Sequence, residues 1–240
     1  DKGVTAIVTG ERGEGVLTRH GLEEYVSDCV ILLDQRVDEQ IATRRLRIVK
    51  YRGSAHGTNE YPFLLDAQGF TLLPHTAISQ QYIVSDEFIS SGVKKLDVLL
   101  NSKGYYRGGT VLISGTSGSG KSSLAAHFIE AACQRGERSL YFAFEESPSQ
   151  VTRNMRSIGI DLQRWQDQGV LHIEAVRPTS IGLEALLVSI QRLTQQFKAQ
   201  VVVFDPISSI KPAGAAKDAY LMLMRLVDYF KARQITCVLT

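Results

Sequence analysis

Residues 115–122 read Gly-Thr-Ser-Gly-Ser-Gly-Lys-Ser. This stretch matches the pattern G-x-x-x-x-G-K-[ST] at every fixed position, between an apolar run at residues 110–114 and a helical pattern that begins near Lys121. Glycines let the backbone turn so that successive N–H groups point into one concavity, which the positive end of the next helix completes. Because strand, loop and helix come in the required order, the stretch predicts a phosphate-binding loop and not an ordinary glycine-rich turn.

This loop predicts a nucleotide site in which single residues have defined roles. Lys121 would reach the β- and γ-phosphate oxygens, and the Ser122 hydroxyl would ligate Mg²⁺. The expected cofactors are therefore ATP and Mg²⁺. The candidate nucleotide-binding residues here are Thr116, Ser117, Gly118, Ser119, Gly120, Lys121, Ser122 and Ser123.

The sequence around the loop alternates between strand and helix patterns. Strands are expected at residues 111–114, 139–144 and 200–204, and helices near 121–135, 148–158, 181–197 and 216–233. Such alternation is typical of right-handed βαβ crossovers and a parallel sheet, so the predicted fold class is α/β. In the helix after the loop, the apolar residues expected to face the sheet are Leu124, Ala125, Phe128, Ile129 and Ala132. Gly136 is expected to end that helix.

The first 80 residues have a different pattern. Strands are expected at residues 29–33 and 44–52, joined by a polar connection at 34–43, and a strand pair is expected at 61–66 and 70–74. Together they predict an antiparallel meander.

Residues 4–9 and 235–240 share a β-branched alternation, and the β-rich block precedes the phosphate loop instead of following it. The chain also starts without a methionine, directly on a strand expected at residues 4–9, and stops on a strand pattern. We therefore expect a stretch of a protein with two homologous domains. Residues 1–80 would close the first domain, residues 81–90 would link the two, and residues 91–240 would open a truncated second domain.

Composition restricts the partners that can be expected. The chain has 240 residues, 44% of them hydrophobic, and its net charge of +2 comes from 27 basic and 25 acidic residues. This balance indicates neither a nucleic acid nor an anionic membrane as partner. No stretch approaches the roughly 20 apolar residues of a membrane span, so the expected location is cytoplasmic. Cys29, Cys133 and Cys237 lie far apart and form no C-x-x-C pair, so they are predicted to be small buried side chains.

Acidic residues follow two of the predicted strands. Residues 201–205 form an apolar run that ends in Asp205, which is typical of a Walker B strand whose carboxylate holds a Mg²⁺-bound water. Glu145 and Glu146 directly follow the strand expected at residues 139–144. A glutamate beside the Walker B strand can orient or deprotonate the attacking water. The candidate catalytic residues are therefore Glu145 and Glu146, and the candidate metal ligands are Ser122, Asp205 and Glu146.

Consecutive side chains cannot point the same way. One glutamate is therefore expected to face the nucleotide, and the other the metal or a neighbour. The pair could instead begin a solvated helix at residues 147–149, because negative charge is favourable near a helix N-terminus.

Four segments together resemble the KaiC family of RecA-like ATPases: residues 21–28, 91–97, 115–122 and 142–150. The resemblance runs along nearly the whole chain and joins the end of a first domain to the start of a second. It implies two tandem RecA-like domains, a double-ring hexamer with ATP bound between subunits, and ATPase activity. Some members form the core of the cyanobacterial circadian clock, so clock or signalling proteins are implied as partners.

The resemblance also gives a role to the basic residues of the first block. A family segment K-x-R-G-x-x-H, which reaches the nucleotide of the next subunit, matches residues 50–56. It implies that Lys50, Arg52 and His56 contact ATP in trans, as an arginine finger does when it stabilises the charge of the transition state. They would serve the first ring, whereas Lys121 belongs to the second. By itself, the alternation of this strand is that of a solvated face.

The chain also departs from the family pattern. Ile158 stands where relatives stack an aromatic residue near the adenine, which predicts a looser contact with the base. The phosphoacceptor serine and threonine of the family lie past Thr240, so serine/threonine autokinase activity stays open. Glu24 and Tyr25 occupy the corresponding place in the first block, which agrees with a first domain that is not phosphorylated.

Two other functions share the same motifs. A RecA- or RadA-type recombinase or a ring helicase would need a basic, glycine-containing loop for DNA, and residues 206–218 contribute only Lys211 and Lys217. Nucleic acid is therefore not an expected partner. A nucleotide-gated signalling scaffold with slow turnover is the second alternative.

Overall fold

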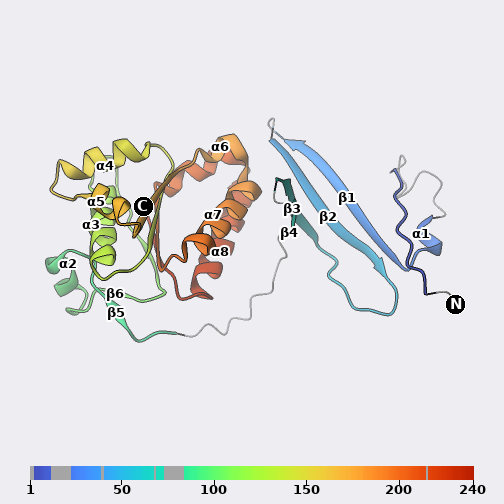
Figure 1. Ribbon diagram of the computed structural model, residues 1–240, viewed down its shortest axis with the longest axis horizontal. Helices are drawn as coiled ribbons and strands as arrows, with labels where there is room; N and C mark the ends of the chain where they lie inside the picture. Colours follow the sequence, from blue (N-terminus) through green and yellow to red (C-terminus); the bar gives the residue numbers. More distant parts are fainter. Residues whose placement is uncertain (1–2, 12–22, 39–40, 68, 73–83, 215) are drawn as a thin grey trace. The chain divides into compact units, whose positions relative to one another are not determined.

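The structure is a computed structural model that describes residues 3–11, 23–38, 41–67, 69–72, 84–214 and 216–240. The chain divides into two compact units, Asp1–His75 and Thr76–Thr240. Figure 1 shows the antiparallel strands of the first unit and the layered helices and strands of the second.

The first unit is a meander, as the sequence predicted. A short helix, α1 (Glu23–Val26), precedes the strands β1 (Cys29–Asp38), β2 (Ile41–Tyr51), β3 (Glu60–Asp66) and β4 (Gly69–Leu72). These strands form an antiparallel sheet in the order β1-β2-β3-β4. The last residues of the expected fourth strand, 73–74, lie outside the described residues.

The polar connection predicted at residues 34–43 is wrong, because most of it is paired strand. The ladder pairs Asp34 with Arg45 and Asp38 with Ile41. Arg36 forms ion pairs with Asp34 (2.9 Å) and with Glu60 of β3 (2.8 Å). Charged residues can lie in a strand when opposite charges face each other across the ladder, and composition alone does not reveal such pairs.

The strand predicted at residues 4–9 is also wrong. Residues 3–11 form neither helix nor strand, and Ile7 is 91% exposed. β-branched alternation favours an extended chain, but a strand also needs a neighbour for its N–H and C=O groups.

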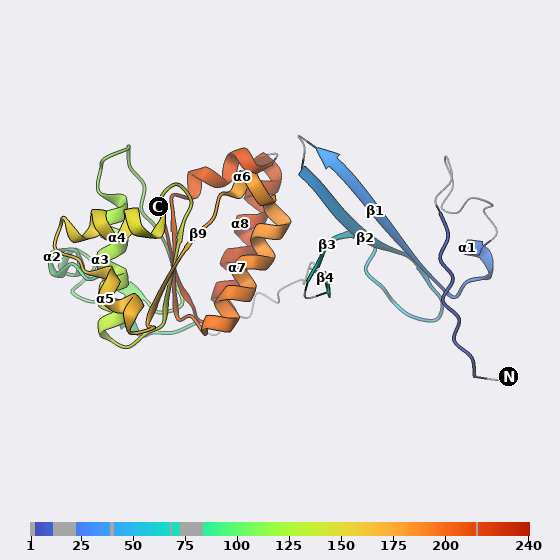
Figure 2. The same cartoon turned by 45° about the horizontal axis from the view of Figure 1, so that its top comes forward.

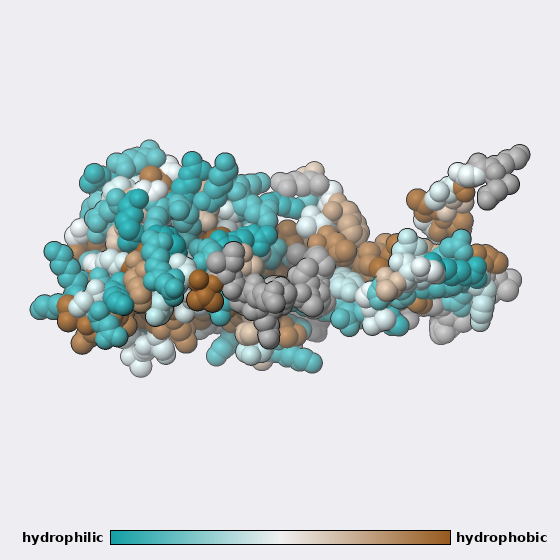
Figure 3. Space-filling view, turned by 90° about the horizontal axis from the view of Figure 1, so that it is seen from below, coloured by the Kyte–Doolittle hydropathy of each residue, from teal (hydrophilic) through white to brown (hydrophobic). Residues whose placement is uncertain are grey.

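Large apolar side chains are exposed on one face of the meander. Ladder pairs place Leu33 opposite Leu46 and Leu65 opposite Phe70, and paired residues of antiparallel strands share a face. Leu33, Leu65 and Phe70 are each more than half exposed. Apolar surface gathers over this sheet in the space-filling view (Figure 3). Exposed apolar surface of this kind is typical of an interaction site.

The second unit is built on a five-stranded parallel sheet, which confirms the predicted α/β class. Its strands are β7 (Thr110–Leu112), β8 (Ser139–Ala143), β9 (Leu171–Ala175), β10 (Val201–Asp205) and β11 (Thr236–Leu239), in the order β7-β11-β10-β8-β9. Every residue of β8 is buried, as is usual for a strand covered on both faces. Strand β9 was not expected from the sequence, because it is an edge strand in which His172 and Glu174 interrupt the apolar pattern.

Helices cover both faces of this sheet (Figures 1 and 2). One face carries α3 (Lys121–Gln134), α4 (Pro148–Arg156) and α5 (Leu162–Asp167), and the other carries α6 (Pro178–Ile181), α7 (Leu183–Phe197) and α8 (Ala216–Lys231). The 3₁₀-helix η1 (Ile207–Ala213) follows β10. The apolar residues of α3 that we expected to face the sheet are buried, except that Leu124 is half-buried. Gly136 follows the end of α3 with a φ of 78°, as predicted.

The start of the second unit is fastened to α3. Strand β5 (Phe88–Ile89) pairs with β6 (Tyr105–Tyr106), and α2 (Lys94–Leu99) lies between them in the sequence. The Asp97 carboxylate accepts hydrogen bonds from the Ser90 hydroxyl (2.6 Å) and from the N–H and hydroxyl of Ser91 (2.9 and 2.6 Å). A Cβ on Gly92 would lie 2.2 Å from the carbonyl oxygen of His127 in α3. The motif at residues 91–97 therefore has a structural role. Residues 81–83 of the predicted linker lie outside the described residues. The rest of that segment, residues 84–90, contains strand β5.

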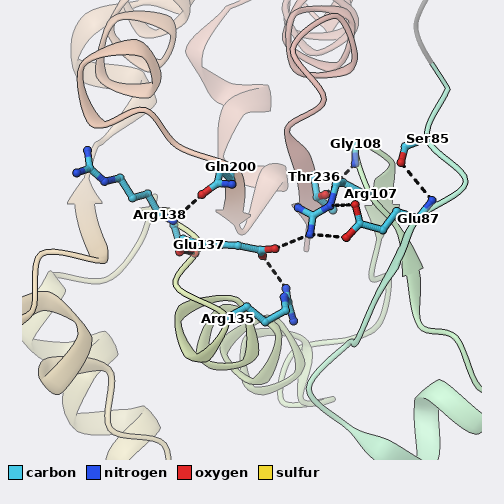
Figure 4. A network of polar contacts seen from close by, with 10 residues as sticks. Ser85, Glu87, Arg107, Gly108, Arg135, Glu137, Arg138, Gln200 and Thr236 are labelled. Carbon is cyan, nitrogen blue, oxygen red and sulfur yellow. Dashed lines mark hydrogen bonds and ion pairs between the residues drawn. The ribbon is translucent and has the colours of Figure 1, made fainter.

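A network of ion pairs stabilises the end of the sheet where β7 and β8 begin (Figure 4). Glu137, whose side chain is 7% exposed, accepts from Arg107 and from Arg135 at 2.7 Å each, and Arg107 also binds both oxygens of Glu87. Burial opposes ionisation of Glu137, but the hydrogen bonds and charges of the two arginines outweigh it and hold its pKa below the ordinary value.

Two further predictions concern the chain as a whole. Cys133 and Cys237 are buried as predicted, but Cys29 is exposed at the start of β1. Among the residues that the structure describes, no helix has both the length and the apolar character that a membrane crossing requires.

Candidate functional site

The phosphate loop joins β7 to α3, and its backbone requires glycine. Gly118 and Gly120 have φ angles of 77° and 91°, in the left-handed region that other residues rarely adopt. A Cβ on Gly115 would lie 2.4 Å from the Ser119 hydroxyl. Residues 114–120 are exposed, and the first N–H groups of α3 have no partner within the helix. The loop therefore presents backbone donors to solvent at a helix N-terminus, which suits an anion.

Two side chains at the start of α3 face this loop and the sheet. The Lys121 ammonium donates to the carbonyl oxygens of Gly115 (3.0 Å) and Thr116 (2.9 Å), so it lies against the loop that precedes it. The Ser122 hydroxyl interacts with the hydroxyl of Tyr141 on β8. The Lys121 ammonium and the Ser122 hydroxyl thus both lie at the start of α3, beside the loop.

The acidic residues lie at the same edge of the sheet as the loop. Asp205 is the last residue of β10 and pairs with Ala143, the last residue of β8. Glu145 and Glu146 follow β8 directly, and the loop follows β7. Because these strands are parallel, their carboxyl ends share one edge, where α/β proteins bind ligands.

Asp205 is held by two hydroxyl groups. The Tyr141 phenol donates to Oδ2, and the Thr240 hydroxyl donates to Oδ1. Tyr141 is 1% exposed. Burial raises its pKa well above the ordinary value, and the charge of Asp205 adds to this effect, so the phenol keeps its proton. Neither hydroxyl was expected at the site from the sequence. The available signal was a tyrosine inside an apolar strand, since a buried phenol needs a partner.

Glu145 and Glu146 point to different neighbours, as expected for consecutive residues. Glu145 Oε1 accepts from the Ser209 hydroxyl of η1 at 2.6 Å. The Glu146 carboxylate accepts from Asn154 Nδ2 of α4 at 3.1 and 3.3 Å. Both glutamates are exposed.

The acidic pair also stands directly before the first turn of α4. Ser147 caps this helix in a reciprocal arrangement with Gln150. The alternative that the pair stands at the start of a helix is thus correct for its position in the chain. Both carboxylates nevertheless lie at the same edge of the parallel sheet as the phosphate loop.

The donor set at this edge fits magnesium. It contains the Asp205 carboxylate and the Ser122 hydroxyl, and the described part of the chain holds no group of three or more His, Cys, Asp or Glu that could bind a metal by itself. Mg²⁺ keeps several waters and is usually bound by one or two carboxylates together with phosphate oxygens. Zinc would require three or four protein ligands.

The basic segment belongs to the first unit. Lys50 Nζ donates to the carbonyl oxygens of Glu24 (2.9 Å) and Tyr25 (3.3 Å), at the end of α1. Arg52 donates to the Tyr25 carbonyl oxygen (3.0 Å) and pairs with Asp28 (3.2 Å).

His56 lies in the same segment, and its Nδ1 is 3.2 Å from the carbonyl oxygen of Gly57. Residues 21–22 of the motif at 21–28 lie outside the described residues.

The segment after Asp205 is compact. Residues 207–213 form η1, and Ser209 binds Glu145. Lys211 and Lys217 are exposed, the second in the first turn of α8. Ile158, the residue expected near the base, is exposed after α4.

A family model described as "ATPase: KaiC" matches residues 1–77 and 89–240. The chain belongs to the KaiC ATPase family. Membership implies nucleotide binding, and the parallel sheet with its phosphate loop is the RecA-like ATPase core that the resemblance implied.

Three relatives in the KaiC family illustrate the similarity. The circadian clock protein KaiC2 of Synechocystis sp. is 50% identical over 239 residues, which are 100% of this chain and 42% of that protein. KaiC3 of the same organism is 34% identical over 97% of this chain and 46% of its own length. The circadian clock oscillator protein KaiC of Thermosynechococcus vestitus is 36% identical over 98% of this chain and 45% of its own length. The chain therefore spans less than half the length of these relatives.

Proposed function

We propose that this chain binds MgATP at its phosphate loop and hydrolyses the γ-phosphate, with Glu145 and Glu146 as the groups that act on the attacking water. The observation that carries the proposal is the meeting of the loop, Asp205 and the acidic pair at one edge of the parallel sheet. Membership in a family of ATPases supports it.

The residues of the loop would bind and orient the triphosphate. The N–H groups of residues 116–123 and the start of α3 would hold the β- and γ-phosphates, and Lys121 would turn from the loop carbonyls to the phosphate oxygens. Ser122 would ligate Mg²⁺, with Asp205 holding one of its waters and Glu146 as a third candidate ligand. When bound, the ion would neutralise charge between the β- and γ-phosphates.

The acidic pair would complete the site. Glu145 is oriented by Ser209 and Glu146 by Asn154, so both carboxylates are fixed in direction while exposed at the edge where the γ-phosphate would end. A carboxylate in such a position can orient a water for in-line attack and accept its proton.

We extend the proposal to assembly. The chain would cover the junction of two tandem domains, with residues 1–80 closing the first and residues 91–240 opening the second. In support, the family model matches two stretches separated by residues 78–88, and the sheet of the first unit exposes an apolar face. The protein would form a hexamer with nucleotide between subunits, in the cytoplasm, and its partners would be clock or signalling proteins, since relatives are named as circadian clock proteins.

In such a ring, Lys50, Arg52 and His56 would contact the nucleotide of the neighbouring subunit. The contacts of Lys50 support this role. Its described partners are neutral carbonyl oxygens, so its positive charge is available to a phosphate group.

The test is phosphate release by the purified chain and by its Glu145→Gln and Glu146→Gln variants, singly and together. Loss of the catalytic carboxylate should slow release by roughly 10²- to 10⁴-fold, with binding of a fluorescent ATP analogue retained. Glu130→Gln, on α3 outside this edge, is the matched control and should release phosphate at the unaltered rate. Light scattering must show the same assembly for all variants. Unchanged release by the double variant would refute the assignment.

A further inference from the structure

Tyr141 lies inside the second unit, yet its hydroxyl reaches the site. Its ring belongs to the apolar core between the sheet and α3. On the ladder, Tyr141 pairs with Val203, two residues before Asp205. Residues two apart on a strand share a face, so Tyr141 and Asp205 both point toward α3, and the phenol extends along the sheet to the carboxylate.

The tyrosine hydroxyl is not required for packing. Phe142 and Phe144 on the same segment fill the other side of the sheet with aromatic rings that lack a hydroxyl. A buried hydroxyl must have a hydrogen-bond partner or it destabilises the fold. The Tyr141 hydroxyl binds Asp205 and lies close to Ser122, which are two of the three residues that the proposed function assigns to Mg²⁺.

The direction of the hydrogen bond determines its effect on Asp205. The phenol O–H donates to Oδ2, so the carboxylate is the acceptor. Thr240 donates to Oδ1 from the end of β11. With one donor on each oxygen, from the strands on both sides of β10, the carboxylate cannot rotate freely. Both oxygens also have a hydrogen-bond partner already, which suits contact with the ion through a water.

We propose that Tyr141 is a positioning residue of the nucleotide site, whose hydroxyl holds the Asp205 carboxylate and the Ser122 hydroxyl in the arrangement that a divalent cation on a triphosphate needs. This inference rests on the proposed function. It predicts that the hydroxyl contributes to the cation dependence of nucleotide binding and the ring contributes to stability.

Tyr141→Phe separates these two contributions, because it removes the hydroxyl and keeps the ring. The matched control is Tyr105→Phe, a half-buried tyrosine of the same unit whose ring packs edge-on against Phe128. Binding of a non-hydrolysable ATP analogue to the purified chain is titrated with Mg²⁺ and, separately, measured in EDTA. The melting temperature of each variant is recorded without nucleotide.

Tyr141→Phe should raise the half-saturating Mg²⁺ concentration roughly tenfold, as loss of an outer-shell partner does, with binding in EDTA unchanged. Tyr105→Phe should leave both quantities unchanged. In an Asp205→Asn background, Tyr141→Phe should add no further shift, because its effect acts through that carboxylate.

An unchanged Mg²⁺ dependence, or an equal loss of binding with and without Mg²⁺, would overturn the inference while leaving the proposed function intact. Absence of analogue binding by the unaltered chain would overturn the proposed function, and the inference with it. If Tyr141→Phe does not fold, Tyr141→Met removes the same hydroxyl behind an adaptable side chain and must give the same shift.

Discussion

Replacing Glu137 by glutamine tests how the ion pairs stabilise the end of the parallel sheet where β7 and β8 begin. The substitution keeps the shape of the side chain and removes the charge that Arg107 and Arg135 share at 2.7 Å. Breaking a fully buried pair costs about 3–5 kcal/mol. The Arg107 and Arg135 side chains are 21% and 29% exposed, and Arg107 keeps Glu87, so solvent and the remaining partner reduce the loss. We expect a decrease of about 2–3 kcal/mol in the free energy of unfolding of the second unit.

Urea unfolding followed by tryptophan fluorescence measures this loss. Trp165 is the single tryptophan of the chain and is buried in the second unit, so the signal reports on that unit. The matched control is Glu87→Gln, which removes the exposed end of the same network and should cost less than about 1 kcal/mol. Equal losses for the two variants, or a loss below about 0.5 kcal/mol for Glu137→Gln, would refute the reasoning.

The difference in the free energy of unfolding between the unaltered chain and Glu137→Gln should depend on pH, which gives a second check. The pKa of Glu137 in the folded chain lies below its ordinary value, so its stabilising contribution is fully present above about pH 4.3, where the unfolded group is ionised. It is lost as the pH falls through the folded pKa. The stability difference between the unaltered chain and Glu137→Gln should therefore be constant from about pH 6 to 8 and shrink in more acidic solution.

Two further predictions concern single positions. Gly120→Ala should destabilise the second unit by about 1–3 kcal/mol, because alanine is strained at a φ of 91°, and it should weaken binding of the ATP analogue; unchanged urea midpoint and affinity would contradict the role of this glycine. Of the three thiols, Cys29 should react fastest with a thiol reagent at pH 8 because it is exposed, whereas burial raises the pKa of Cys133 to about 11 and that of Cys237 further; mass spectrometry of the modified native chain checks this order, and early labelling of Cys237 would contradict the buried strand.

The sequence predicted those parts of the fold that depend on residues close together in the chain. The loop could be recognised because its glycines serve local backbone requirements, seen here in the positive φ of Gly118 and Gly120. Helix α3 followed from apolar residues at a spacing of three and four. Strand β9 was missed because an edge strand carries polar residues, and the strand at residues 4–9 was wrong because alternation does not supply a neighbour. The shared edge of Asp205 and the acidic pair is confirmed by the parallel ladder, and their chemical roles stay predictions.

Local patterns of residues were enough to predict the phosphate loop, the parallel α/β core and the acids at the strand ends, because each depends on residues that are close together in the chain. The groups that surround those acids follow from the folded arrangement of the strands. The strand order β7-β11-β10-β8-β9 brings Tyr141 and Thr240 to Asp205 from both sides, although they lie 64 and 35 residues away in the chain. No local pattern encodes such distances, because strand pairing follows from the burial of the whole sheet between two layers of helices.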